Sequence, residues 1–336
     1  MKKRVPSLLT ATAGALALAL TLAAPARAQT KALEKVTLML NWYLYSEHAP
    51  FFLGKERGFY AEEGIDLDIQ EGRGSAVTAQ AVAAKSATFG YIDVTTMIKA
   101  AAKGAPLKST GVLFQVSPMS VMGFSEKNIK TPKDIIGKTV ATTPGDSMSQ
   151  IWPLFLQKTG LKQSDFKTVA GDAQTKLNAV INGRADLLLG YVMDQAIKLQ
   201  DAVHKPVYAI RFADYGVNMV SSGIIVQKDY LKAHEDVVKR FLRAATRSLE
   251  DAAKDPAAAV DAMLKANPKS GVRDTAIIGM KETARLYKGP DNPNDRPLRV
   301  GAKNMAETLE LLTEYGGVEK SQAGKAEDYY TNAYLP

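Results

Sequence analysis

The 336-residue chain contains no cysteine, so it can form no disulfide and offers no thiolate as a nucleophile or as a metal ligand. Histidine is also scarce: His48, His204 and His234 lie far apart in the sequence, and no HExxH motif occurs. GxSxG and Walker sequences are missing as well. We therefore expect no metal, no cofactor and no catalytic residues, and we favour a protein that binds without chemistry.

Charge of one sign is not concentrated in any segment. The formal net charge is +8 at pH 7, from 43 Lys and Arg against 35 Asp and Glu, and after Lys2-Lys3-Arg4 no run of basic residues occurs. Such a modest, dispersed excess gives no reason to expect nucleic acid or an anionic membrane as a partner. With 46% hydrophobic residues the chain can bury substantial cores, and its length favours two domains over one.

The markedly apolar segment Leu8–Ala24 has the features of a secretory signal. Basic residues 2–4 precede it, and Ala26-Arg27-Ala28 supplies the small residues of a signal-peptidase site before Gln29. Because the apolar core is short and interrupted by polar residues, we expect residues 1–28 to be cleaved, the alternative being an uncleaved membrane anchor. Cleavage would remove four basic residues and no acidic one.

The sequence from Leu38 to Pro50 predicts the loop around which the fold is organised. The apolar run up to Leu40 is typical of a buried strand, and Pro50 is favoured in the first turn of a helix. In open α/β sheets ligands bind outside the carboxyl ends of strands, so the intervening loop would face a binding crevice. Its side chains suit a flat, polar ligand, and they are Asn41, Trp42, Tyr43, Tyr45, Glu47 and His48.

Two residues of this loop have a structural alternative. His48 could hydrogen-bond a ligand, or it could help to cap the helix that begins near Pro50. Trp42 could lie against the ligand, or it could cover the hydrophobic core, as tryptophan often does.

Two glycine turns that each open a helix are the next candidates. Gly72–Ser75 precedes an alanine-rich helix, and Thr143–Ser147 precedes a second helix, which Pro153 should kink or restart. Such turns present free backbone N–H groups and a hydroxyl to a ligand, although ordinary helix capping gives the same pattern. The candidate contacts are Gly74, Ser75, Gly145 and Ser147. A dinucleotide site is not expected, because Gly72-Arg73-Gly74 lacks the third glycine of that fingerprint.

Two segments of similar order predict two similarly built α/β lobes. In each, an alanine-rich helix is followed by a strand that carries Gly-Tyr and then by an aspartate. Asp93 would cap a helix at a strand's carboxyl end in the first lobe and is a candidate ligand contact there. Tyr191 and Asp194 would face the crevice from the second lobe. We place lobe 1 at residues 29–121 and 224–336 and lobe 2 at residues 122–223, with crossings near Met119–Phe124 and Met219–Val226.

Beyond the second crossing the pattern is almost wholly helical, apart from a polar loop at Gly289–Arg299. We expect these helices to back lobe 1. Their predicted ranges are Asp229–Lys254, Pro256–Lys265, Val272–Lys288, Val300–Tyr315 and Ala326–Tyr334.

The segment that opens the chain after the signal resembles a known family. Leu40–Tyr43, Glu47–Phe52 and Lys55–Ile65 are similar to the opening of the periplasmic substrate-binding proteins related to binders of thiamine pyrimidine precursors. Riboflavin, alkanesulfonate, taurine and nitrate binders are relatives of that family. The resemblance covers most of the chain from Val36, because further motifs fall where the family's pattern has them: Gly72–Ser75, Phe89-Gly90, Lys138–Gly145 and Ala185-Asp186.

The resemblance implies the type II periplasmic binding-protein fold, in which two α/β lobes are joined by two crossings and a ligand binds in the interlobe cleft as it closes. It also implies a periplasmic location, a small-molecule ligand and an ABC permease as partner, and we expect a monomer.

The family leaves the ligand open. The Asn41-Trp42 pair favours a thiamine pyrimidine precursor or a related heteroaromatic, whereas family members that bind these precursors tend to carry a glutamate near Tyr191 and Asp194. The alternative is a small anion (alkanesulfonate, taurine or nitrate), for which Arg73 would be the attraction. Fungal relatives that make the pyrimidine on this scaffold need a cysteine-rich stretch with iron, so an enzyme is the less favoured alternative here.

Overall fold

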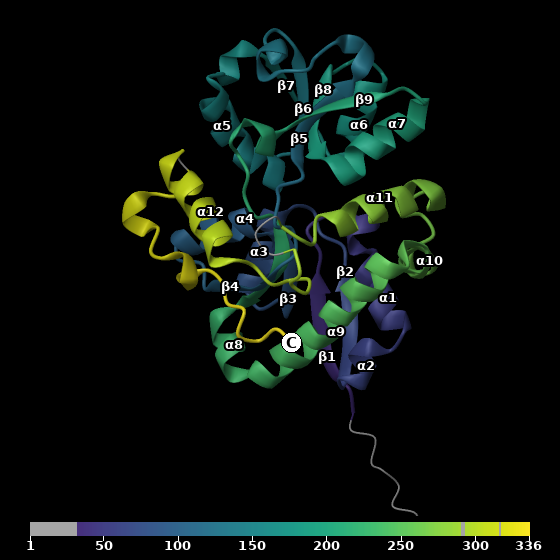
Figure 1. Cartoon of the computed structure of the whole chain (residues 1–336), viewed down its shortest axis with the longest axis vertical. Helices are drawn as coiled ribbons and strands as arrows, with labels where there is room; N and C mark the ends of the chain where they lie inside the picture. Colours follow the sequence, from purple (N-terminus) through teal and green to yellow (C-terminus); the bar gives the residue numbers. More distant parts are fainter. Residues whose placement is uncertain (1–31, 290–292, 316) are drawn as a thin grey trace, which may run out of the picture. The chain divides into compact units, whose positions relative to one another are not determined.

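The computed structural model describes residues 32–289, 293–315 and 317–336, so the predicted signal segment, residues 1–28, lies outside the described part of the chain. Two five-stranded mixed sheets organise the described residues, and helices pack against each of them (Figure 1). The predicted two-lobed α/β fold is confirmed. We call the first sheet with its helices lobe 1 and the second sheet with its helices lobe 2.

The first sheet has the strand order β2-β1-β3-β10-β4. Strand β1 (Glu34–Met39) runs parallel to β2 (Ile65–Gln70) and β3 (Phe89–Asp93). Strand β10 (Ser222–Gln227) is antiparallel to both β3 and β4 (Leu107–Val112). Because β1, β2 and β3 are parallel, the loop after β1, the glycine turn after β2 and the end of β3 lie at one edge of the sheet, as predicted.

The second sheet repeats this plan in the order β7-β6-β8-β5-β9. Strand β6 (Thr139–Thr142) runs parallel to β7 (Lys167–Ala170) and β8 (Leu187–Tyr191). Strand β5 (Met119–Phe124) is antiparallel to β8 and to β9 (Val207–Arg211). The second glycine turn follows β6 and Tyr191 ends β8, so they lie at the corresponding edge of lobe 2.

The chain passes between the sheets twice, as expected. The crossings comprise residues 113–118, between β4 and β5, and residues 212–221, between β9 and β10. The predicted lobe boundaries, after residues 121 and 223, fall inside β5 and β10 instead. Strand β5 is buried over its whole length, so its sequence carries no local sign of where the chain changes sheet.

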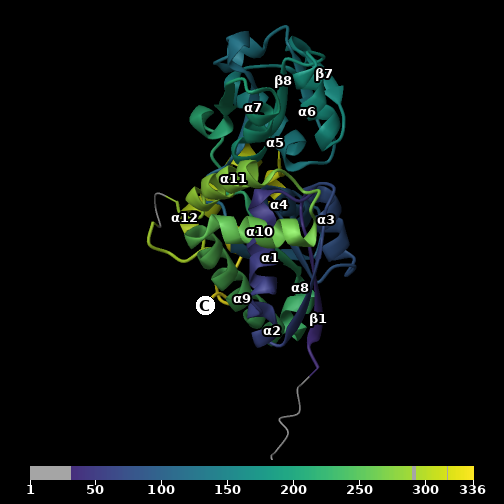
Figure 2. The ribbon, with the colours of Figure 1, turned by 90° about the vertical axis from the view of Figure 1, so that its right-hand side faces the viewer.

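Helices from both ends of the chain cover lobe 1. Helix α1 (Ala49–Glu56) packs against α9 (Glu235–Lys254) and α10 (Pro256–Ala266), and the three lie side by side in both views (Figure 1 and Figure 2). A Cβ at Gly54 would lie 1.7 Å from the Ser248 hydroxyl oxygen, so this glycine is needed for the close packing of α1 on α9. The other N-terminal helices of lobe 1 are α2 (Phe59–Glu62), α3 (Ser75–Ala83) and α4 (Val94–Ala102).

The C-terminal helices follow the prediction except at two places. The predicted helix Asp229–Lys254 is divided at His234 into α8 (Lys228–Ala233) and α9. A helix over Ala326–Tyr334 is wrong, because only a 3-10 turn forms at Ala326–Asp328 and the backbone of residues 329–331 then pairs with Ser109 of β4. The remaining helices are α11 (Arg273–Arg285) and α12 (Ala302–Glu314).

Lobe 2 carries α5 (Ser147–Thr159), α6 (Ala173–Ile181) and α7 (Ile197–Val203), and a π-helical turn, Val192–Ala196, precedes α7. Helix α5 continues through Pro153 to Thr159, where a kink or restart was expected. Helix α11 contacts both lobes, since it packs on the 3-10 turn Ser46–His48 and also on α7 and the π-helical turn. Among the described residues, no helix has the length and apolar character to cross a membrane.

Candidate functional site

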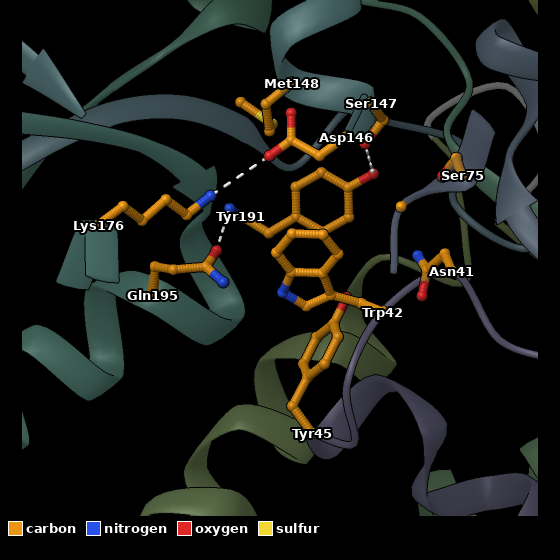
Figure 3. Close-up of a pocket in the computed structure, with 11 residues that line it drawn as sticks. Asn41, Trp42, Tyr45, Ser75, Asp146, Ser147, Met148, Lys176, Tyr191 and Gln195 are labelled. Carbon is orange, nitrogen blue, oxygen red and sulfur yellow. Dashed lines mark hydrogen bonds and ion pairs between the residues drawn. The ribbon is translucent and has the colours of Figure 1, made fainter. Parts of the chain in front are cut away.

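A small cavity lies where the strand ends of the two lobes meet. Its volume is about 30 Å³, which is room for about two water molecules. Figure 3 shows side chains from both lobes converging on it. The lining residues are Asn41, Trp42, Tyr45, Gly74 and Ser75 of lobe 1 and Asp146, Ser147, Met148, Lys176, Tyr191 and Gln195 of lobe 2.

Seven of the thirteen predicted contacts line this cavity, and the sequence signals for them were strand ends and glycine turns. They are Asn41, Trp42, Tyr45, Gly74, Ser75, Ser147 and Tyr191. The other six lie beside or behind the cavity and are Tyr43, Glu47, His48, Asp93, Gly145 and Asp194.

Gly74 and Gly145 bring the two glycine turns into contact. Gly74 has a φ of 120°, and a Cβ built on it would lie 2.8 Å from the carbonyl oxygen of Gly145. The Gly74 N–H donates to the Asn41 carbonyl oxygen at 2.8 Å, which fixes this turn to the loop after β1. Glycine at position 74 therefore allows both the left-handed backbone and the close approach of the lobes. Gly145 supports the cavity without lining it.

Tyr191 reaches from lobe 2 toward the end of β3. Its hydroxyl is 3.1 Å from Ser147 Oγ, 3.2 Å from Ser221 Oγ and 3.4 Å from Asp93 Oδ2. Asp93 is buried behind this hydroxyl, and burial raises the pKa of its carboxyl group. Asp93 also accepts the backbone N–H groups of Thr95 and Thr96, which confirms it as the N-cap of α4.

A buried ion pair that sequence reasoning missed forms part of the lobe 2 wall. Lys176 Nζ lies 3.3 Å from Asp146 Oδ2, and the two side chains are 2% and 7% exposed. Asp146 is also the N-cap of α5, since its Oδ1 accepts the Ser149 N–H at 2.7 Å. Lys176 lies over the Trp42 ring of lobe 1, 5.5 Å from its centroid. Asp146 could have been found as a cap after the glycine turn, whereas a lysine within α6 gives no such signal.

Trp42 separates the small cavity from a larger outer groove. The indole is half-buried and lines both spaces, and it also packs on the core of lobe 1, which is the core-covering role predicted for it. The outer groove has a volume of about 780 Å³. It is lined by charged residues of both lobes, among them Glu71, Arg73, Asp172 and Lys198. Arg73, the cation proposed for an anionic ligand, therefore faces the outer groove and not the small cavity.

His48 and Glu47 are fully buried behind the cavity and do not line it. His48 Nε2 lies 2.8 Å from Asn41 Oδ1, and the His48 side chain makes no capping bond to α1. Burial lowers the pKa of His48 to about 3 and raises the pKa of Glu47 to about 7. The Tyr45 hydroxyl donates to Glu47. His48 thus orients Asn41, which does line the cavity.

Tyr43 and Asp194 contact each other across the lobes outside the small cavity. The Tyr43 hydroxyl donates to Asp194 Oδ2 at 2.9 Å and accepts from Lys198 Nζ at 3.1 Å and Gln195 Nε2 at 3.2 Å. Asp194 and Lys198 also form an ion pair at 2.9 Å. We call these four residues the Tyr43 cluster. The cluster joins the loop after β1 to the π-helical turn and α7, so it holds the lobes together. Of its four members only Gln195 also lines the cavity.

The described ranges contain no group of three or more histidine, aspartate or glutamate side chains that could hold a metal ion. What the cavity offers is a set of hydrogen-bonding groups, one ion pair and three aromatic rings, those of Trp42 and Tyr45 from lobe 1 and of Tyr191 from lobe 2. This arrangement suits the binding of a small polar molecule.

Two similarly built lobes, two crossings and a cavity with contributions from both lobes define the fold of a solute-binding protein. The chain belongs to the family described as NMT1/THI5 like, whose model matches residues 45–259.

Three relatives are similar to most of the chain. The riboflavin-binding protein RibY of Chloroflexus aurantiacus is 26% identical over 259 residues, which cover 76% of this chain and 73% of the relative. A 4-amino-5-hydroxymethyl-2-methylpyrimidine phosphate synthase of Legionella pneumophila is 26% identical over 237 residues, 70% of this chain and 74% of the relative. The formylaminopyrimidine-binding protein of Halalkalibacterium halodurans is 25% identical over 306 residues, 90% of this chain and 91% of the relative.

Solved structures share the fold. The alkanesulfonate-binding protein SsuA of Xanthomonas axonopodis pv. citri matches with a TM-score of 0.67 and 14% identity, covering 90% of this chain and 99% of that one. At this identity the match supports the fold and leaves the ligand open.

Proposed function

We propose that this solute-binding protein is the periplasmic receptor of an ABC importer and that its ligand is an uncharged heteroaromatic, a thiamine pyrimidine precursor or a related pyrimidine. The observation that carries the proposal is the half-buried Trp42 indole at a cavity that is otherwise lined mostly by hydrogen-bonding side chains. An indole that stacks on a flat ring contributes about 0.5–1.5 kcal/mol beyond simple burial. Because His48 holds the Asn41 side-chain oxygen, the Asn41 amide N–H groups are available as donors to the ring.

The charges around the cavity disfavour an anionic ligand. The N-terminus of a helix attracts anions, but at α5 that position is occupied by the Asp146 carboxylate. Lys176 compensates the charge of Asp146, so the lining carries one negative and one positive side chain. A sulfonate, taurine or nitrate would bring a second anion against Asp146. A neutral ring meets no such repulsion.

The size of the cavity favours binding by closure. A space of about 30 Å³ holds water molecules but no pyrimidine ring. The lobes must therefore separate, or their side chains move, to admit a ligand. Because each lobe supplies only part of the lining, a ligand that contacts both would favour the closed arrangement by its differential affinity.

The relatives include both binding proteins and phosphate synthases, which makes catalysis the second candidate. We favour a receptor because the chain has no cysteine for the iron-dependent chemistry expected of the enzymes. Incubation with a candidate pyrimidine, followed by mass spectrometry of the released molecules, separates the two. A receptor releases the ligand unchanged, whereas a new product in stoichiometric amount would contradict the proposal.

The ligand class is tested by native mass spectrometry of the protein as purified and by calorimetric titration. We expect 4-amino-5-hydroxymethyl-2-methylpyrimidine or a close relative to bind in a one-to-one complex, and taurine and nitrate to give no heat. Tight binding of an anion without binding of any pyrimidine would refute the proposed ligand class.

The location is tested by expressing the full chain in a Gram-negative host and fractionating the cells. We expect the periplasmic fraction to contain protein whose N-terminal residue is Gln29. Retention of residues 1–28 in a membrane fraction would contradict a soluble periplasmic receptor.

A further inference from the structure

The Lys176–Asp146 pair is unusual because both charges are buried and both face the cavity. Lys176 is 2% exposed and Asp146 7% exposed at the side chain, and both line the space beside Trp42. In Figure 3 a dashed line joins Lys176 to Asp146, and the Trp42 side chain is drawn below it. Removing two charges from water is costly, so a buried ion pair is weak evidence for a role in stability alone.

The hydrogen-bonding capacity of the pair is not used up within the protein. Asp146 Oδ1 accepts the Ser149 N–H, and Oδ2 meets Lys176 Nζ at 3.3 Å, a long distance for a charged pair. A carboxylate oxygen has two acceptor positions, and an ammonium group has three N–H donors. Asp146 can therefore accept a further hydrogen bond, and Lys176 can donate one, to a molecule in the cavity that both residues line.

We propose that Lys176 and Asp146 are the specificity-determining residues of lobe 2 and that they recognise an acceptor next to a donor on one edge of the ligand ring. This inference rests on the proposed function. Lys176 donates to a ring nitrogen, Asp146 accepts from the adjacent exocyclic amino group, and Trp42 of lobe 1 covers a face of the ring. A ring nitrogen beside an amino group, as in a 4-aminopyrimidine, presents this pair of groups.

Two neighbouring groups support this assignment. Lys176 lies 5.5 Å from the Trp42 ring centroid, so a ring placed beside the indole has its edge within reach of the ammonium group. Asp146 keeps its orientation through the α5 cap, so its second oxygen is fixed relative to the cavity without a ligand. Recognition by the pair requires a closed cleft, because Trp42 and the pair belong to different lobes.

The test is a double-mutant cycle between protein and ligand, read by calorimetric titration of the full mature chain. The probes are 4-amino-5-hydroxymethyl-2-methylpyrimidine, its analogue without the amino group, and the pyridine analogue in which the adjacent ring nitrogen is CH. The variants are Asp146→Asn, which keeps an oxygen to cap α5, and Lys176→Met, with Lys176→Gln as a second replacement. Lys198→Met is the matched control, since Lys198 also lies over a lobe 1 ring, that of Tyr43, but outside the cavity.

We expect the wild type to bind the amino probe at least tenfold more tightly than either analogue. Asp146→Asn should reduce the preference for the amino group to threefold or less, and Lys176→Met and Lys176→Gln should do the same to the preference for the ring nitrogen. Lys198→Met should weaken the binding of all three probes by one common factor, so the preferences for the amino group and for the ring nitrogen are both retained.

If the Lys176 and Asp146 variants bind all three probes more weakly by the same factor, the inference is overturned and the pair has a structural role. Circular dichroism and thermal unfolding without ligand establish that each variant folds. If Asp146→Asn does not fold, Lys176→Met and Lys176→Gln still test the proposal. If the wild type binds none of the three probes, the proposed function itself fails. Binding of the amino probe by the wild type without preference over the analogues would refute only this inference.

Discussion

From the contacts of the Tyr43 cluster we predict that the Tyr43 hydroxyl, which lies outside the cavity, controls closure of the lobes. Tyr43→Phe removes the hydrogen bond that the hydroxyl donates to Asp194 and those that it accepts from Lys198 and Gln195. The ring itself is retained, so packing against Lys198 stays. The substitution therefore tests the contact between lobes and replaces no residue of the cavity lining, in which only Gln195 loses a hydrogen bond.

The magnitude follows from the charged partners. A hydrogen bond to a charged group contributes about 1.5–3 kcal/mol. Asp194 and Lys198 keep their ion pair at 2.9 Å in the variant, so neither charge is left unpaired. We expect the closed state to lose about 2 kcal/mol, and because 1.4 kcal/mol corresponds to tenfold, ligand affinity should weaken roughly thirtyfold.

The lack of cysteine makes the lobe movement measurable. Cysteines placed at exposed Lys55 of lobe 1 and Lys133 of lobe 2 accept a donor and an acceptor dye, and energy transfer between them reports the lobe separation. With Tyr43→Phe we expect a more open distribution without ligand and a weaker titration with 4-amino-5-hydroxymethyl-2-methylpyrimidine. Tyr208→Phe, on an exposed tyrosine of β9, is the matched control and should change neither.

A Tyr43→Phe protein with the wild-type lobe separation and affinity would refute the role in closure. A lower melting temperature together with unchanged lobe separation would make this hydroxyl a determinant of stability instead.

Three further substitutions have expected outcomes. Trp42→Ala should weaken pyrimidine binding by about ten- to a hundredfold through lost stacking and burial, measured by calorimetry; a collapse of the ligand-free melting temperature would assign the indole to the core. Glu47→Gln should gain stability relative to the wild type as pH rises from about 4.5 to about 7, by roughly 3 kcal/mol. The reason is that burial raises the pKa of Glu47, so that ionisation destabilises only the wild type. Urea unfolding at pH 5 and pH 8 measures this, and the same difference in unfolding free energy between variant and wild type at both pH values would contradict it. Gly279→Ala should oppose closure, because its Cβ would lie 2.4 Å from Ser46 Oγ of lobe 1 and 2.9 Å from the Met193 carbonyl oxygen of lobe 2; energy transfer between the two lobes checks it, and a wild-type distribution would count against the contact.

The positions of the glycine turns and strand ends could be predicted because they depend on local chemistry. A left-handed backbone requires glycine at position 74, and a helix start after it favours serine. Parallel strands bring such turns to one edge of each sheet, which is why Asn41, Ser75 and Ser147 were found from the sequence.

The direction of the polar side chains at those strand ends could not be predicted in the same way. Glu47, His48 and Asp93 follow strands as the cavity residues do, but their side chains are buried behind the cavity and do not line it. Lys176 gave no signal for the opposite reason, since a lysine within a helix is usually solvated and becomes buried here through contacts with Asp146 and Trp42, which are distant in sequence. Local pattern thus locates the edge of the site, and tertiary packing decides which side chains reach it.

The buried histidine bears on how the binding of a ligand depends on pH. Because burial holds the pKa of His48 at about 3, its ring stays neutral between pH 5 and pH 8. In this neutral form Nε2–H donates to Asn41 Oδ1, so the Asn41 amide keeps its N–H groups toward the cavity at every such pH. Glu47, with a pKa near 7, is the neighbouring group that does titrate there, and it contacts Tyr45, which lines the cavity. A change in affinity between pH 5 and pH 8 that persists in Glu47→Gln therefore does not come from the histidine. Its source is the ligand's own ionisation or another buried carboxyl group such as Asp93, whose pKa burial also raises.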